Sequence, residues 1–218
     1  MAKIFPSLIS ADVLNLEQEI TRLAPYCDGF HLDIMDNNFV PNLTMGPAII
    51  NAIGTIAPKP LWVHLMVHNP SALIDALTLT NGSIVGFHYE NDGHKRDLIK
   101  KIRDKDWQPS MSINPATHVE DAFPYLDELS QLLIMSVEPG FSGQPLLTDT
   151  IQKIEPLNAY RQTSGLHFSI GMDGGINAGN IVALKEKGVD DFAIASGIFD
   201  APDPVSMLKN LREEVSDV

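Results

Sequence analysis

Short apolar runs alternate along the chain with longer segments in which apolar residues recur every three or four positions. The short runs are typical of buried strands, and the longer segments are typical of helices with one apolar face. The predicted strands cover residues 3–8, 29–35, 60–67, 83–89, 109–113, 131–137, 167–172 and 191–196. The first predicted helix begins near Asp12, and the others cover residues 47–54, 70–79, 95–104, 118–126, 147–161, 178–188 and 204–215.

This strict alternation predicts an α/β fold. Nearly continuous apolar strands between helices favour a parallel sheet whose faces are both covered. Eight strand–helix pairs in 218 residues fit a closed (β/α)8 TIM barrel with eight parallel strands better than an open doubly wound sheet. No low-complexity linker divides the chain, so we expect a single barrel domain over residues 1–218.

The charge and cysteine content narrow the classes of partner and compartment. A formal net charge of −13 argues against nucleic acid or an anionic membrane as a partner, because both attract clustered Lys and Arg. The single cysteine, Cys27, allows no disulfide within the chain and favours a reducing compartment. No segment approaches the ~20 apolar residues of a membrane span. We therefore expect a cytoplasmic protein.

Polar side chains interrupt several of the predicted strands. In the second strand His31, Asp33 and Met35 share one face, and the apolar residues between them share the other. His64 stands in the third strand, and Asp173 ends the seventh. In a barrel, alternate side chains face the interior, and the site forms where the strands end. These polar residues are therefore expected to meet inside one end of the barrel.

Two histidines and two aspartates at such positions are candidate ligands for a divalent transition metal. Any one buried histidine or aspartate is more often a structural residue than a ligand. Four of them at the same end of different strands are costly to bury unless something compensates their charges. The candidates for the ion are Zn, Fe, Mn and Co, and these ligands alone do not distinguish between them.

Glycine-rich segments follow the last three predicted strands and point to an anionic ligand. These segments are residues 138–145, 173–176 and 194–199, and none of them contains a lysine. Barrels of this kind commonly bind phosphate through backbone N–H groups of the last loops. A phosphorylated ligand is therefore compatible with an acidic chain. Each glycine pattern alone is weak evidence, because such glycines often serve only the turn.

The longer motifs together resemble the ribulose-phosphate 3-epimerase family. The matching stretches are "PSLISAD", "FHLDIMDNNFVPN", "HLMV", "FHYE", "INPAT", "MSVEPGFSGQ" and "DGGI", in the same order from Pro6 to about Pro204. The resemblance implies a (β/α)8 barrel, one divalent metal ion, a phosphorylated ketose substrate and self-association into a homo-oligomer. It implies reversible inversion at C3 between D-ribulose 5-phosphate and D-xylulose 5-phosphate.

The resemblance also implies roles for individual residues. The family's metal ligands correspond to His31, Asp33, His64 and Asp173, and its two catalytic carboxylates correspond to Asp33 and Asp173. The substrate-binding positions correspond to Ser7, Met35, His64, Met66, Met135, Gly140, Phe141, Ser142, Gly143, Gly174, Gly175, Ala195 and Ser196. His88 and Glu90 of "FHYE" also match, and we interpret them as interior packing and hydrogen-bonding residues.

The chemistry explains why such residues would be needed. A carboxylate cannot remove a proton next to a ketone unless the enediolate is stabilised as it forms, and a metal bridging the C2 and C3 oxygens supplies that charge. Inversion requires proton removal on one face and return on the other, which two carboxylates on opposite sides achieve. The methionines would form a cover that excludes water.

The sequence departs from the family pattern at three positions. Asn37 replaces a usual glycine, so we expect a different conformation in the loop after the second strand. Trp62 replaces an aspartate two positions before His64, which removes a partner for that ligand and makes the interior bulkier. Ala195 replaces a glycine, and its methyl group would limit the approach of the backbone to a phosphate unless the dihedral angles permit it.

Three other functions are alternatives to epimerisation of ribulose 5-phosphate. Epimerisation of allulose 6-phosphate would use the same mechanism in a slightly longer pocket. The related phosphate-sugar decarboxylases use an Asp-x-Lys-x-x-Asp pattern, and "HLDIMDNNF" lacks that lysine. A non-catalytic sugar-phosphate-binding barrel would be expected to have lost an acid or a ligand, and Asp33, Asp173, His31 and His64 are all present.

Overall fold

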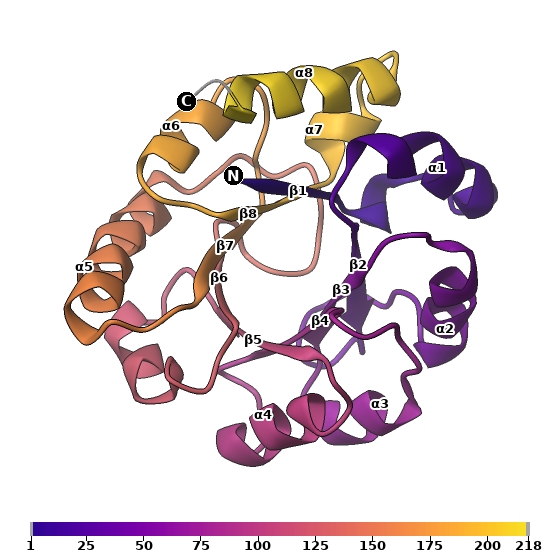
Figure 1. Cartoon of the computed structure of the whole chain (residues 1–218). Helices are drawn as coiled ribbons and strands as arrows, with labels where there is room; N and C mark the ends of the chain where they lie inside the picture. The colour runs from indigo at the N-terminus through magenta and orange to yellow at the C-terminus, as the bar shows by residue number, and fades with distance from the viewer. Residues whose placement is uncertain (1, 217–218) are drawn as a thin grey trace.

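The computed structural model describes residues 2–216 and has eight parallel strands arranged as a barrel inside a ring of helices (Figure 1). The strands are β1 Lys3–Pro6, β2 Phe30–Met35, β3 Leu61–Met66, β4 Ile84–His88, β5 Gln108–Ile113, β6 Gln131–Met135, β7 Ser169–Asp173 and β8 Asp191–Ile194. Their order is β1-β8-β7-β6-β5-β4-β3-β2, and a parallel bridge between Ser7 and His31 closes the ring. The predicted (β/α)8 TIM barrel is confirmed.

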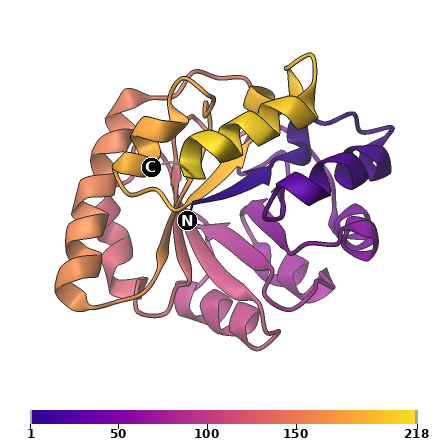
Figure 2. The same ribbon diagram turned by 45° about the horizontal axis from the view of Figure 1, so that its top comes forward.

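Helices cover the outside of the barrel all round (Figure 2). The α-helices are α1 Leu16–Leu23, α2 Pro47–Ile56, α3 Pro70–Ala76, α4 Lys95–Arg103, α5 Ile154–Ser164, α6 Ile181–Glu186, α7 Ser196–Phe199 and α8 Pro204–Ser216. The 3-10 helices are η1 Leu8–Ser10, η2 Ala24–Tyr26, η3 Val119–Tyr125 and η4 Thr148–Lys153. Within residues 2–216, no helix has the length and apolar character needed to cross a bilayer.

The strands are buried on both faces, which explains why they read as continuous apolar runs. Every residue of β2, β3 and β4 is buried. Their outward side chains pack against the helices, and their inward side chains fill the barrel. The polar residues of β2 and β3 therefore lie in the barrel interior, where their burial is costly unless they find polar partners.

Three helical segments differ from the sequence-based prediction. The segment 118–126 forms the 3-10 helix η3, which contains Pro124, rather than an α-helix. Helix α1 begins at Leu16 rather than near Asp12, because the Asp12 carboxylate accepts hydrogen bonds from the Leu14 N–H and the Asn15 amide and forms a turn. The segment 147–161 begins as η4 before it continues as α5.

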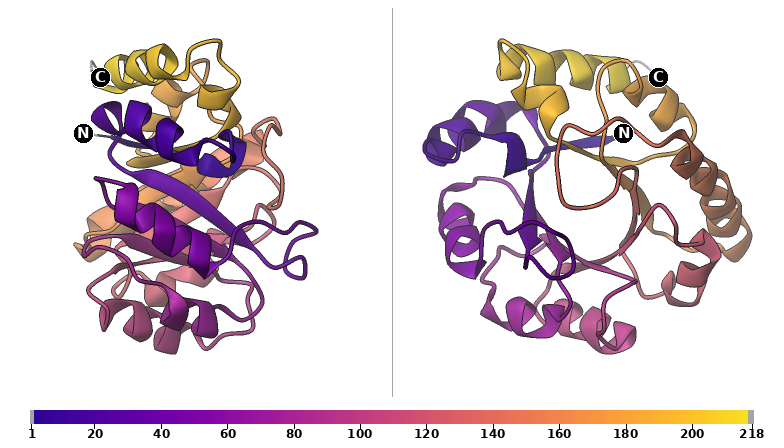
Figure 3. Two further views of the ribbon diagram at one scale, coloured as in Figure 1. Left: turned by 90° about the vertical axis from the view of Figure 1, so that its right-hand side faces the viewer. Right: turned by 180° about the vertical axis from the view of Figure 1, so that it is seen from behind.

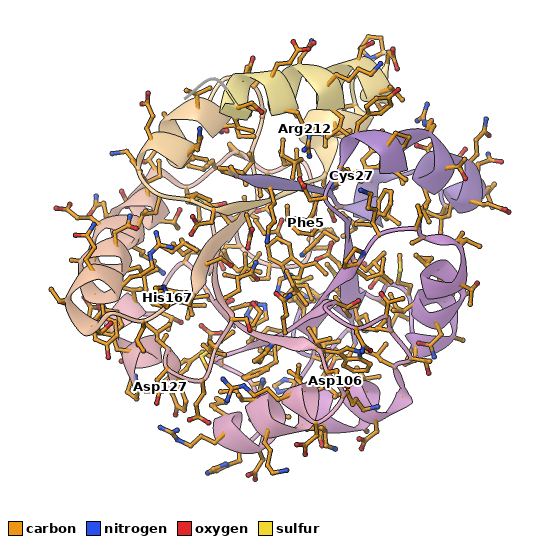
Figure 4. The ribbon with its side chains drawn as sticks, viewed as in Figure 1. Phe5, Cys27, Asp106, Asp127, His167 and Arg212 are labelled. Carbon is orange, nitrogen blue, oxygen red and sulfur yellow. The ribbon has the colours of Figure 1, made fainter. Side chains whose placement is uncertain are left out.

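Trp62 fills the barrel interior below the polar residues. Its side chain is fully buried and meets the rings of Phe5 and His31 edge to face, with centroids 5.2 and 4.8 Å away. Phe5 extends from β1 toward the middle of the barrel in Figure 4. A Cβ at Gly171 of β7 would lie only 3.1 Å from the indole. The bulkier interior predicted from Trp62 is thus present, and a glycine on the facing strand leaves room for it.

The loops that follow β2 and β6 project from the same end of the barrel (Figure 3, left). In these loops, the Asn42 amide donates a hydrogen bond of 2.7 Å to the carbonyl of Gly140. The hydroxyls of Ser10 and Ser142 form a second link of 3.0 Å between the first and sixth loops. These contacts join chain segments far apart in sequence around the carboxyl ends of the strands.

Candidate active site

The four predicted metal ligands meet at the carboxyl end of the barrel. His31 and Asp33 come from β2, His64 comes from β3, and Asp173 is the last residue of β7. The register of β2 and β3 places Asp33 beside His64. One ligand atom from each of the four residues can be chosen so that all lie within 4.8 Å of one another.

Two imidazole nitrogens in this cluster are buried without a hydrogen-bond partner. They are Nε2 of His31 and Nδ1 of His64. His64 Nδ1 lies 3.3 Å from Oδ1 of Asp33 and 3.6 Å from Oδ2 of Asp173, and His31 Nε2 lies 4.0 Å from that same Asp173 oxygen. Buried polar atoms normally have partners, so both nitrogens point to a ligand between the carboxylates.

Ser7 determines which nitrogen of His31 faces the cluster as an acceptor. The Ser7 hydroxyl donates to Oδ2 of Asp33 at 2.8 Å, because an ionised carboxylate can only accept. The same hydroxyl oxygen lies 3.1 Å from His31 Nδ1, and it therefore accepts the Nδ1–H. The lone pair of a neutral His31 ring is then on Nε2, which is the nitrogen that faces Asp173.

The electrostatics of the cluster favour a positive charge. Burial alone raises the pKa of Asp33, but the charges and hydrogen bonds of His31 and His64 lower it well below its usual range. Burial alone lowers the pKa of His64, but the nearby carboxylates of Asp173 and Asp33 raise it to about 9. Two imidazoles and two carboxylates of this kind fit a divalent transition metal ion. The chain therefore has a cluster that can hold a metal ion.

A pocket opens above the cluster and leads to the glycine-rich loops. Asp33 and Asp173 line its floor. The predicted substrate-binding residues that line it are Met35, Met66, Met135, Gly140, Phe141, Ser142, Gly143, Gly174, Gly175, Ala195 and Ser196. Ser7 and His64, which were also predicted to bind substrate, do not line the pocket. Both contact the carboxylate of Asp33. The pocket joins a charged floor, methionine walls and a polar backbone rim.

Sequence reasoning missed several apolar lining residues. They are Ile9, Val137, Ile176 and Ala193, and they are accompanied by Pro139 and Gln144 of the sixth loop. Their apolar side chains resemble core residues in the sequence, so only the alternation of the neighbouring strands could have suggested them.

The glycine loops need glycine at two positions for packing as well as for backbone freedom. A Cβ at Gly174 would lie 2.5 Å from Val137, and one at Gly175 would lie 2.4 Å from the backbone nitrogen of Leu146. Both glycines have positive φ, 114° and 65°. Ala195 has a φ of −98°, which lies outside the left-handed region that favours glycine.

Asn37 begins a tight turn beside the pocket. Its φ of 55° lies in the left-handed region, which glycine occupies without strain and asparagine tolerates. The carboxylate of Asp36 accepts hydrogen bonds from the backbone N–H groups of Asn38, Phe39 and His68, and these bonds hold the turn in place. Asn37 therefore adopts a backbone conformation that also suits glycine.

His88 and Glu90 lie directly behind His64. Nε2 of His64 is 2.8 Å from Nε2 of His88, and Nδ1 of His88 is 3.2 Å from Oε2 of Glu90. Burial lowers the pKa of His88 to about 4, so its ring is neutral at neutral pH. Burial raises the pKa of Glu90, but hydrogen bonds from His88, Thr117 and the Asn114 N–H outweigh that effect and lower it. The expectation of interior hydrogen bonding is confirmed, and the bonds lead to His64 of the cluster.

A family model described as the ribulose-phosphate 3 epimerase family matches residues 3–199 of the chain. The chain belongs to this family. A ribulose-phosphate 3-epimerase of Helicobacter pylori strain J99 is 35% identical over 217 residues, which are 98% of this chain and 100% of that protein. Ribulose-phosphate 3-epimerase 1 of Cupriavidus necator is 37% identical over 97% of this chain and 91% of its own length. The Escherichia coli K12 protein is 33% identical over 99% and 96%.

Solved structures with low sequence identity share the fold of this epimerase-family chain. KGPDC from Streptococcus mutans superposes with a TM-score of 0.72 at 10% identity and covers 100% of this chain and 99% of its own. A 3-hexulose-6-phosphate synthase from Salmonella typhimurium has a TM-score of 0.67 at 14% identity, with 99% of each chain covered. At such identities the likeness supports the barrel fold alone.

Proposed function

We propose that this protein epimerises D-ribulose 5-phosphate and D-xylulose 5-phosphate at C3 with the help of one divalent metal ion. The observation that carries the proposal is the pair of carboxylates at the pocket floor, Asp33 and Asp173, which share a buried cluster with two histidines in a member of this family. The names of the relatives, which are ribulose-phosphate 3-epimerases, support the choice of substrate.

In this proposal, four atoms would hold the ion: His31 Nε2, His64 Nδ1 and one carboxylate oxygen each from Asp33 and Asp173. When bound, a divalent ion stabilises the negative charge that develops on the substrate oxygens as the proton leaves. Zn, Fe, Mn and Co all suit this donor set.

Asp33 and Asp173 exchange the proton on the two faces of the substrate. The hydrogen bond from Ser7 and the neighbouring imidazoles hold Asp33 as a carboxylate, which is ready to accept a proton. Asp173 reaches the pocket from β7 and serves the opposite face. In each direction one of the two residues is ionised and removes the proton, and the other is protonated and returns one, so the configuration at C3 inverts.

The remaining predicted residues bind and shield the substrate. The methionine side chains at 35, 66 and 135 are nearly fully buried and exclude water from the reacting carbon. The backbone N–H groups of the glycine loops are candidates for binding the phosphate, which requires no lysine in an acidic protein. Self-association, a cytoplasmic location and a single domain over residues 1–218 stay predictions; residues 1, 217 and 218 lie outside the described part of the chain.

Proton NMR in D₂O tests the proposal. The metal-loaded protein should convert ribulose 5-phosphate to xylulose 5-phosphate and introduce deuterium at C3. Asp173→Asn should lower the rate by about 10²–10⁴-fold, which is the usual contribution of a general acid or base. Metal content must be measured for both proteins, because Asp173 is also a proposed ligand.

Four results would contradict the proposal. Nearly full activity of Asp173→Asn would exclude the two-carboxylate mechanism, and unchanged activity after verified metal removal would exclude the metal. Allulose 6-phosphate is the comparison substrate, and a higher kcat/KM for it would reassign the substrate to a ketohexose phosphate. Binding of ribulose 5-phosphate without deuterium exchange would indicate a sugar-phosphate-binding protein.

A further inference from the structure

A chain of hydrogen bonds connects Glu90 through His88 to His64 of the candidate metal cluster. The first link joins Nε2 of His64 to Nε2 of His88 at 2.8 Å. The two ring planes are within 17° of parallel, and their centroids are 4.9 Å apart. Since the nitrogens are much closer than the centroids, the rings lie edge to edge, which is the geometry of an N–H···N hydrogen bond.

The direction of this bond is determined by Glu90. An ionised carboxylate can only accept, so His88 Nδ1 must carry the proton that it shares with Oε2 of Glu90. A neutral His88 ring then has its lone pair on Nε2, and that nitrogen accepts a proton from His64 Nε2. A neutral His64 is left with its lone pair on Nδ1, the nitrogen that faces Asp33 and Asp173.

The carboxylate of Glu90 is itself held firmly. Its Oε1 accepts a hydrogen bond of 2.8 Å from the backbone N–H of Asn114 and another from the Thr117 hydroxyl. Lys153 donates to the carbonyls of both Asn114 and Thr117, at 2.7 and 2.8 Å, and so fixes the loop that presents these donors. His88 is fully buried, with the ring of Phe39 4.8 Å from it, so water does not compete for its nitrogens.

We propose that Glu90 is a positioning residue that acts through His88 to keep His64 in the tautomer whose Nδ1 can bind the metal ion. This inference rests on the proposed metal site and adds a determinant of its affinity. On the other side of the cluster, Ser7 orients His31 in the same manner. Each metal-facing nitrogen is therefore selected by a hydrogen bond at the opposite nitrogen of its ring.

Glu90→Gln should reverse the chain of hydrogen bonds. The backbone N–H of Asn114 can only donate, so the amide oxygen of the new side chain must face it. The amide NH₂ then faces His88 Nδ1 and donates to it. His88 would carry its proton on Nε2 and donate to His64, and His64 would carry its own proton on Nδ1, where it blocks the metal.

The expected result is a loss of Zn²⁺ affinity of about 10- to 100-fold in competition titrations with a chromogenic chelator. The second readout is ¹⁵N NMR of the histidine rings, which separates protonated from bare nitrogens. His88 should be protonated at Nδ1 in the wild-type protein and at Nε2 in Glu90→Gln.

Two control variants separate this effect from loss of charge or of packing. Glu120→Gln removes one exposed negative charge from η3 and should leave Zn²⁺ affinity unchanged. Thr117→Val removes one donor to Glu90 but keeps the direction of the chain, so Zn²⁺ affinity should fall less than in Glu90→Gln.

Three results would overturn the inference. The first is a ¹⁵N spectrum of the wild-type protein in which His88 carries its proton on Nε2, and this test does not depend on the folding of any variant. Wild-type Zn²⁺ affinity in a folded Glu90→Gln protein would reject the positioning role and leave the metal site intact. If Zn²⁺ does not shift the ring nitrogens of His31 and His64 in the wild-type protein, the metal site itself fails, and the role of Glu90 fails with it.

Discussion

Trp62 packs inside the barrel and also contacts the group of four candidate metal ligands. The indole lies against Phe5 below and against His31 at the cluster, with no exposed surface. Residues that are buried this deeply contribute through many close contacts, because the interior is packed as densely as a crystal. The orientation of His31 therefore depends on an apolar neighbour as well as on Ser7.

Removing this side chain should destabilise the protein strongly. Trp62→Ala leaves a large cavity, and we expect the free energy of unfolding to fall by about 3–5 kcal/mol. Urea titration followed by circular dichroism measures the change. Trp62→Phe is the matched control and should lose less, because it keeps a ring beside Phe5 and His31. A loss below about 1 kcal/mol for Trp62→Ala would show that the indole is not a packing element.

The residues of the cluster could be selected from the sequence as candidate ligands, because their residue types conflict with their apolar surroundings. A histidine or an aspartate in an apolar strand must have a partner, and the alternation of the strand places it inside the barrel. The roles of His88 and Glu90 toward His64 could not be derived in this way. They depend on a nitrogen-to-nitrogen contact between two neighbouring strands, and the sequence does not contain that distance.

At the scale of elements, the loop after β2 supports the loop after β6, and the loop after β6 lines the pocket. The Asn42 amide reaches the Gly140 carbonyl across 98 positions of sequence, and Gly140 lines the pocket. The contact holds the sixth loop close to the pocket before a ligand arrives. A loop with such a contact needs less ordering on binding, which favours affinity.

Asn42→Ala should therefore weaken substrate binding. The lost hydrogen bond acts equally on bound substrate and on the transition state, so KM should rise by about five- to tenfold while kcat stays nearly constant. Steady-state kinetics with ribulose 5-phosphate measures both constants. Asn38→Ala changes an exposed side chain in the same loop and should leave KM unchanged. A fall in kcat with constant KM would show instead that the contact acts only in the transition state.

Most elements followed from the sequence, and the exceptions have local causes. Strands were predicted well because burial on both faces gives continuous apolar runs that end at turn residues. The fifth helical segment was predicted wrongly as α-helix, since its apolar spacing suits one but Pro124 cannot donate a hydrogen bond. The start of α1 was also wrong, because the Asp12 turn competes with the helix for its first residues.

At the scale of the whole molecule, the unfolding of one strand or helix would disturb the elements packed against it. The C-terminal helix α8 is tied to the start of the barrel by Asp28, which accepts hydrogen bonds from the Ile4 N–H and the Arg212 guanidinium at 2.9 and 2.6 Å. Figure 4 shows Arg212 beneath α8 at this contact. Such contacts between distant parts of the chain favour cooperative unfolding.

We expect the protein to unfold in a single transition, as one domain does. Tryptophan fluorescence and circular dichroism should give coincident urea curves. A Zn²⁺ concentration 100 times the dissociation constant should raise the free energy of unfolding by about 2.7 kcal/mol, because the ion binds only the folded cluster. Two separate transitions would show that the chain contains more than one folding unit.

The closure of the barrel has a consequence for how the protein is made. The first strand has its full ladder with the last strand, from Lys3 beside Asp191 to Pro6 beside Ile194, whereas within residues 2–216 its bridge pairing toward β2 is limited to Ser7 and His31. On the ribosome, the candidate ligands of β2 and β3 are made early. Strand β1 precedes them in the chain, but its ladder with β8 cannot be complete until residue 194 has been made. The proposed metal site is then expected to reach its final geometry only after β8 has been made and has paired with β1.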